Sequence, residues 1–123
     1  MTRHRRGERG AATVVMTAVL AIGLLLALAA ARAGAAAVAG ARADSAADAA
    51  ALAAADMLAL GRGPGAAVTA ADETAGDNGA RLDSCDCHGR FVTVRVTVSV
   101  PLLGADAQAV ARAEVRSECI LGC

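Results

Sequence analysis

Residues 10–31 read GAATVVMTAVLAIGLLLALAAA, an apolar stretch without a single ionisable side chain. At a rise of about 1.5 Å per residue, a helix of this length reaches about 33 Å, and the hydrocarbon core of a bilayer is about 30 Å thick. The sequence therefore predicts a transmembrane helix over residues 11–31. The rest of the chain is divided into a short arm before this helix and a small domain after it.

Charge is distributed unevenly on the two sides of the predicted span. Residues 1–10 carry four arginines and one glutamate, whereas the rest of the chain carries eight arginines and eleven acidic residues. Basic residues beside the N-terminal end of a span are retained in the cytoplasm. We therefore expect a disordered cytoplasmic arm over residues 1–10 and an extracytoplasmic location after about Arg32. We expect no nucleic-acid binding by the arm, because topology alone explains one short arginine cluster.

The helix-forming sequence continues beyond the span. Alanine, the best helix former, dominates residues 33–60, and no proline occurs before Pro64. One helix of about fifty residues and about 75 Å is the simplest interpretation. Residues 32–62 would be its extracytoplasmic continuation, ended by the glycines and proline of residues 61–65.

This continuation is polar on part of its surface only. Asp44, Asp48 and Asp56 fall within a sector of about 120° when successive residues are placed about 100° apart. The other faces offer alanine and glycine, which let helices approach each other closely in membranes. The candidate helix-packing positions are Gly23, Gly34 and Gly40.

Residues 63–123 are predicted to form a small α+β head. A short helix is expected over residues 65–77, with Asn78-Gly79 ending it. Phe91 is the only aromatic residue of the chain, and tryptophan and tyrosine are absent. A core of such small side chains buries little apolar area, so the head should be only marginally stable without cross-links.

The second half of the head has the period of a β-sheet. Valine occupies every second position from 92 to 100, which predicts a half-buried antiparallel strand over residues 91–100. Its partner is expected over residues 80–87, across a turn at His88-Gly89. Residues 105–118 alternate alanine with mostly polar residues. Alanine favours a helix there, but the alternation and the need to cover the valines favour a third strand.

The chain contains four cysteines on the predicted outer side, where thiols usually oxidise, at positions Cys85, Cys87, Cys119 and Cys123. In a three-stranded meander the third strand ends beside the first, which brings the two pairs together. Two cross-links between the pairs are favoured, because a bond within Cys85-Asp-Cys87 would be strained. Each would close a loop of about 35 residues, worth about 3–4 kcal/mol. The alternative is a metal site that combines these thiols with His88, although the usual Cys-x₂-Cys spacing of zinc sites is missing.

The sequence offers no catalytic constellation. It contains no nucleophile–base–acid set, no phosphate-binding glycine loop and no paired carboxylates in a cleft. Ser45 beside Asp44 and Asp48 is interpreted as a helix surface. We expect neither enzymatic activity nor a cofactor.

Three features of the chain resemble the TadE/TadG-like pilus-assembly proteins. They are a basic arm ending in Arg9-Gly10, the span that follows, and the sequence ADSAADAAALAAA at residues 43–55. Farther on, NGARL at residues 78–82, then Cys85 and the valine-alternating strand, are similar to actinobacterial TadE-like proteins encoded in a helicase/secretion gene neighbourhood. The resemblance implies a pilin-like α+β fold with a long N-terminal helix.

The resemblance also implies a function. It would make the chain a non-catalytic, single-pass pseudopilin-like component of a Tad/Flp (tight-adherence) pilus or secretion system. Its partners would be the lipid bilayer and copies of itself or other pilin-like subunits, bound by helix–helix packing. Pilin-like precursors are typically cut after a glycine, which points to Gly10 and Ala11 as the processing site. Val15 stands at the fifth position after this cut, where such precursors typically carry glutamate.

The second hypothesis is a secreted, disulfide-stapled binding module released by signal peptidase. Residues 1–10 suit the n-region of a signal peptide, and Ala27-Leu28-Ala29 suits an A-x-A cleavage site. However, the apolar run exceeds the usual length of about 7–15 residues, and the helix-forming sequence continues past the site. The membrane-anchored form is therefore preferred.

Overall fold

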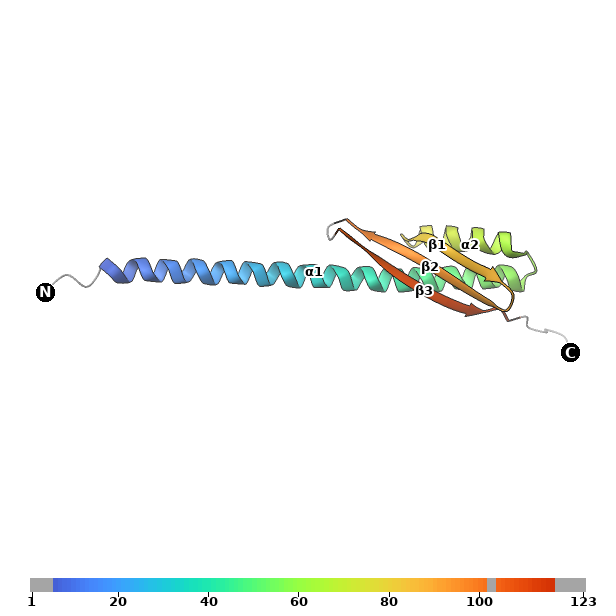
Figure 1. Cartoon of the computed structure of the whole chain (residues 1–123), viewed down its shortest axis with the longest axis horizontal. Helices are drawn as coiled ribbons and strands as arrows, with labels where there is room; N and C mark the ends of the chain where they lie inside the picture. The colour runs from blue at the N-terminus through green and yellow to red at the C-terminus, as the bar shows by residue number, and fades with distance from the viewer. Residues whose placement is uncertain (1–5, 102–103, 117–123) are drawn as a thin grey trace. The chain divides into compact units, whose positions relative to one another are not determined.

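The computed structural model describes residues 6–101 and 104–116. Two helices, α1 (Arg6–Ala59) and α2 (Pro64–Asp77), precede three strands, β1 (Arg81–His88), β2 (Phe91–Val100) and β3 (Ala105–Glu114) (Figure 1). The strands form one antiparallel sheet in the order β1-β2-β3. The expected α+β layout is thereby confirmed. The chain divides into two compact units, Met1–Ala35 and Ala36–Cys123, and α1 contributes residues to both.

Helix α1 ends close to the expected position but begins earlier than expected. It starts at Arg6, so residues 6–10, which were expected to be disordered, are helical. A helix propagates at low cost from a formed alanine-rich segment, which explains this extension. At its end, the Arg62 N–H donates to the Met57 carbonyl and the Gly61 N–H to the Leu58 carbonyl, both at 3.0 Å. Gly61 has a φ of 69°, as a Schellman C-cap requires.

Helix α2 is ended by the predicted Asn78-Gly79 pair. The Ala80 N–H donates to the Ala75 carbonyl and the Gly79 N–H to the Gly76 carbonyl, both at 2.9 Å, while Gly79 has a φ of 72°. This is again a Schellman cap. The helix starts at Pro64, one residue earlier than predicted, because proline suits the first turn, where its missing N–H would have no helical partner.

The sheet has the predicted three strands with a turn shifted by one residue. His88 pairs with Phe91, so the turn between β1 and β2 is Gly89-Arg90 rather than His88-Gly89. Gly89, with a φ of 72°, takes the first turn position, which in a two-residue hairpin loop requires a positive φ. Residues 105–114 form β3, which confirms a strand where alanine content alone favours a helix. The strand ends before residues 115–116, and residues 117–118 of the expected strand lie outside the described residues.

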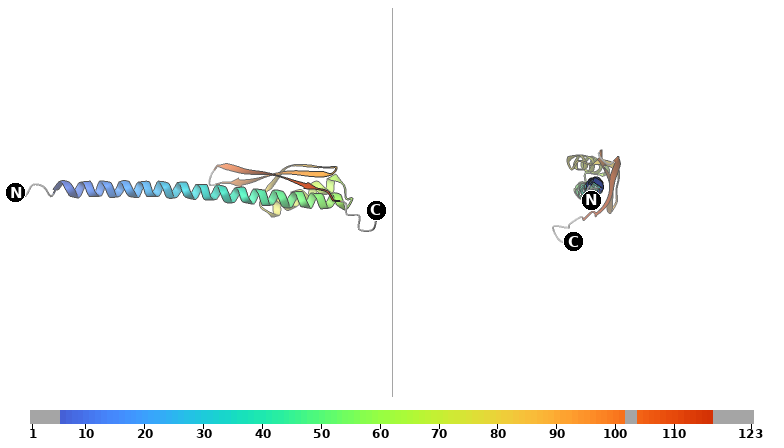
Figure 2. Two further views of the ribbon diagram at one scale, coloured as in Figure 1. Left: turned by 90° about the horizontal axis from the view of Figure 1, so that it is seen from below. Right: turned by 90° about the vertical axis from the view of Figure 1, so that its left-hand side faces the viewer.

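The core lies where the valine face of β2 meets alanine stripes of both helices, which lie on one side of the sheet (Figure 2). Val92, Val94 and Val96 are completely buried. Buried alanines repeat at helical spacing along both helices, at Ala43, Ala46, Ala47, Ala50, Ala51 and Ala54 of α1 and at Ala67, Ala71 and Ala75 of α2. The second part of α1 is therefore a layer of the head itself, whose compact unit begins at Ala36 rather than at residue 63.

Candidate functional site

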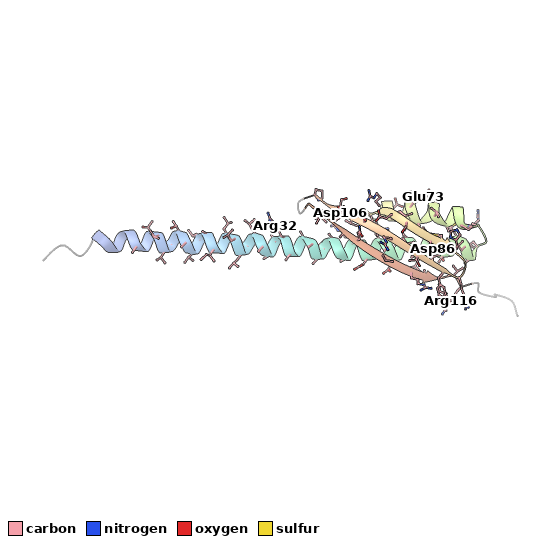
Figure 3. The ribbon with its side chains drawn as sticks, in the orientation of Figure 1. Arg32, Glu73, Asp86, Asp106 and Arg116 are labelled. Atoms are coloured by element: carbon pink, nitrogen blue, oxygen red, sulfur yellow. A yellow bond between two sulfur atoms is a disulfide. The ribbon has the colours of Figure 1, made fainter. Side chains whose placement is uncertain are left out.

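The first part of α1 presents a continuous apolar surface. Every residue from 10 to 34 is exposed, and the large side chains of this part project all around the helix (Figure 3). Val14 is 67% exposed and Leu25 is 66% exposed. The mean hydropathy reaches 2.7, and the helix is long and apolar enough to cross a membrane. Such a surface needs lipid or another protein to cover it.

The Thr17 side chain in this part of α1 is compatible with an apolar surrounding. The Thr17 hydroxyl lies 3.0 Å from the Thr13 carbonyl oxygen and 2.9 Å from the Val14 carbonyl oxygen, so it is satisfied by the backbone of its own helix. Hydroxyl groups in membrane helices commonly use backbone carbonyls in this way, because no water is present to bind them.

The glycines that the sequence singled out all lie on α1. Gly10, Gly23 and Gly34 belong to the first unit, beside Ala11, and Gly40 belongs to the second. A Cβ atom added at any of these four glycines would meet no atom within 4 Å. No contact within the chain therefore requires glycine at these positions, and their role in helix packing stays a prediction.

The cysteines are paired differently from the favoured scheme. Cys85 and Cys87 are joined to each other as a disulfide within β1. Residues two apart on a strand share a face, and their Cα atoms lie 5.3 Å apart, inside the usual disulfide range of about 4.4–6.8 Å. Cross-links from these two cysteines to Cys119 and Cys123 are therefore not what the structure has. Cys119 and Cys123 themselves lie outside the described residues.

His88 lies away from the thiols. Cys87 is buried and faces the core, whereas His88, the next residue of the strand, belongs to the opposite face. Its Nδ1 atom is 3.3 Å from Oδ1 of Asp86, and both side chains are exposed. Across residues 6–101 and 104–116, no three His, Cys, Asp or Glu side chains come together in a way that could hold a metal ion.

A polar cluster that sequence reasoning missed lies on the outer face of the sheet, which is the face away from the helices. The pairing of β1 with β2 shifts between Leu82 and Ser84, so Asp83 is an extra residue in a β-bulge. Its carboxylate accepts a hydrogen bond from the Thr97 hydroxyl and lies 3.2 Å from the Arg81 guanidinium. The alternation of polar residues in the sequence indicates this face, but the alternation does not locate the bulge.

An aromatic–arginine contact lies near the hairpin end of the same face. The Arg112 guanidinium carbon is 4.1 Å from the centre of the Phe91 ring, a cation–π geometry. Nearby, Nε of Arg90 is 3.4 Å from Oε1 of Glu114. Phe91 is 41% exposed, so the only aromatic residue of the chain is a surface residue rather than part of the core.

The described part of the chain thus defines an α+β protein with a long apolar N-terminal helix. Its functional features are surfaces: the uncovered first part of α1, the exposed side of the second part, and the outer face of the sheet. A scan against family models, a search of curated proteins and a search of solved structures each found no match.

Proposed function

We propose that this protein is a single-pass membrane subunit of pseudopilin type, which works in a Tad/Flp-type pilus or secretion system without catalysing a reaction. The observation that carries the proposal is that the two parts of α1 have different surroundings. Its first part is exposed and apolar, and its second part is a core layer of a small head. The proposed span and the head therefore share one helix, Arg6–Ala59.

We propose that lipid and the helices of neighbouring subunits together cover the first part of α1. Gly23 and Gly34 are eleven residues apart, about three helical turns, so they lie on nearly the same side of the helix. Small residues repeated on one side allow close helix–helix contact in a membrane. The four arginines of residues 1–10 favour a cytoplasmic N-terminus and an extracytoplasmic head.

The resemblance to TadE-like proteins supports the pilus or secretion assignment. It rests on the ADSAADAAALAAA stretch at residues 43–55 and on NGARL at residues 78–82. The first stretch supplies seven buried alanines of the head's core and the exposed Asp44 and Asp48, so its composition matches its place in the fold. Pilin-type processing would place a cut between Gly10 and Ala11.

The deciding measurement is the intact mass, with N-terminal sequencing, of the protein recovered from its native membrane fraction. A chain that begins at Met1 or Thr2 is expected for a permanent anchor, and a chain that begins at Ala11 is expected for a processed pseudopilin. A chain that begins near Ala30 and is found only in the medium contradicts both forms of the proposal.

Helix packing is tested by the oligomeric state of the full chain in detergent micelles. We expect Gly23→Leu to reduce the oligomer, because the larger side chain separates two close helices. Ala21→Leu is the matched control, since it adds a similar volume about 160° away around the helix. Equal behaviour of the two variants would contradict packing through this side of the helix.

The second candidate is a secreted module released near Ala29, and one observation favours it. The buried residues of the head begin at Ala39, so cleavage near Ala29 leaves every described core residue in the released part. The same mass measurement separates this candidate from the anchored subunit.

A further inference from the structure

The exposed side of α1 in the second unit carries a regular stripe. Asp44, Asp48, Leu52 and Asp56 follow each other at intervals of four residues, and all four are exposed. Leu52 is 61% exposed, which leaves an apolar side chain between carboxylates. In the described part of the chain none of the three aspartates has an ion-pair partner. We call these four residues the acidic stripe.

The outer face of the sheet carries the complementary pattern. Arg95 lies on the central strand, and Val110, which is 57% exposed, is its direct partner on β3. Arg112 is the next outward residue of β3 and covers Phe91. We call these four residues, Phe91, Arg95, Val110 and Arg112, the basic patch.

The arginines of the basic patch are available for a partner. Arg81 and Arg90, the other arginines of this face, already lie beside Asp83 and Glu114. Arg95 and Arg112 make no ion pair with any described carboxylate. Asp106 pairs with Ser99 toward the other end of the sheet, and Asp86, across Thr93 from Arg112, lies 3.3 Å from His88, so neither forms an ion pair with Arg95 or Arg112 (Figure 3).

We propose that the acidic stripe of one copy docks on the basic patch of a second copy. Opposite charges would meet around an apolar centre in which Leu52 faces Val110, and aromatic and arginine side chains are the residue types that most often dominate such contacts. This interface rests on the proposed function, in which subunits gather in one membrane, and it adds a contact between heads to the packing of the membrane helices.

The two surfaces suit a repeating assembly. The acidic stripe lies on the helix layer and the basic patch on the opposite, outer face of the sheet, so a contact between them uses different surfaces of the two copies (Figure 2). Such an interface continues from copy to copy instead of closing a dimer.

The absence of lysine makes the contact directly measurable. All twelve basic residues are arginines, so Arg95→Lys introduces the first side-chain amine. A water-soluble carbodiimide joins an amine only to a carboxylate that it touches. The full-length variant is reconstituted in liposomes as a mixture of ¹⁵N-labelled and unlabelled chains, treated with the carbodiimide, digested and analysed by mass spectrometry. Arg62→Lys, an exposed position between the two helices, is the matched control.

We expect mixed-isotope adducts between position 95 and Asp44, Asp48 or Asp56, and none of these from the control. Charge reversal by Asp48→Arg should lower the adduct yield about fivefold, as expected for loss of one exposed charge pair. In otherwise native chains, adding Arg95→Asp to Asp48→Arg should restore the head contact. The restored contact is measured as the fraction of the oligomer that dissociates when salt is added. Salt of about 1 M should weaken the contact, because the charges remain near water.

The outcomes separate this inference from the proposed function. An oligomer that forms in liposomes without adducts at position 95, or with adducts only to Asp72, Glu73 or Asp77 of α2, overturns the head interface and leaves the membrane subunit intact. A protein that is monomeric in liposomes, with Gly23→Leu equally monomeric, overturns both.

Discussion

Thr97 shows how a single side chain can depend on a partner that sequence does not reveal. Its side chain belongs to the outer face of β2, yet it is only 4% exposed, and it is the single buried polar residue among those described. The bulge at Asp83 places a carboxylate over it, and that carboxylate, itself 22% exposed, accepts its hydrogen bond. The hydroxyl is thus satisfied only because β1 is irregular at this point.

Removing the Asp83 carboxylate alone should therefore lower the free energy of unfolding more than removing both the carboxylate and the Thr97 hydroxyl. Asp83→Ala leaves the Thr97 hydroxyl buried without a partner, and we expect a loss of about 1–3 kcal/mol in the free energy of unfolding. The double variant Asp83→Ala/Thr97→Val should lose less than the sum of the single variants. Urea unfolding of the full chain in detergent, followed by circular dichroism, measures all three. Additive losses would contradict the coupling.

The disulfide assignment can be tested at the peptide level. Trypsin cleaves after Arg81, Arg90 and Arg116, so Cys85 and Cys87 fall in one peptide and Cys119 and Cys123 in another. The bond within β1 predicts that, without reduction, peptide 82–90 is released alone with a mass two hydrogens below that of its reduced form. Recovery of this peptide joined to residues 117–123 would instead restore the cross-links that the sequence favoured. Alkylated, reduced protein is the control.

At the level of elements, both helices end by local geometry that their sequences encode. Each has glycine in the left-handed conformation one residue past its cap, at Gly61 and Gly79, with the two hydrogen bonds of a Schellman motif. These stops depend on a few neighbouring residues, and for that reason they were predicted within about one residue.

The α2 stop provides a matched pair of substitutions. Gly79→Ala forces a side chain into a φ of 72° and should cost about 1 kcal/mol of stability. Gly76→Ala, inside the same helix and with nothing within 4 Å of the added Cβ, should gain about 0.5–1 kcal/mol. Thermal unfolding of both variants measures the difference. A gain from Gly79→Ala would contradict the capping role.

For the whole molecule, the central feature is a core made of alanine against valine. Alanine side chains let α1 and α2 lie close to the sheet, and the valine face of β2 fills the space between the layers. A close-packed layer of this kind tolerates added volume poorly. The layers of the head therefore lie close together, and their packing depends on side chains of these sizes.

Ala47 tests this packing. It is 1% exposed on the buried stripe, and Ala47→Leu should destabilise the head by about 1–3 kcal/mol through overpacking. Ala41→Leu adds the same volume on the exposed side of the helix and should change stability by less than about 0.5 kcal/mol. Calorimetry of the full chain in detergent checks the pair. Equal stability of the two variants would show that the helix and the sheet are not closely packed.

The sequence by itself determined the features that depend on neighbouring residues. Hydropathy predicted a helix able to cross a membrane, the period of two predicted β2 and β3, and glycine predicted the helix ends. The turn between β1 and β2 was missed by one residue, because neither His88 nor Arg90 is excluded from it by local chemistry.

Only the tertiary structure decided which surfaces meet. It assigned the second part of α1 to the head and placed the bulge at Asp83. Each of these depends on contacts between residues far apart in the chain, or on the register of a strand against its partner. An alanine-rich helix is apolar enough on every side that its sequence does not select the side to bury. The side of α1 that packs against the valine face of the sheet is the side that becomes buried.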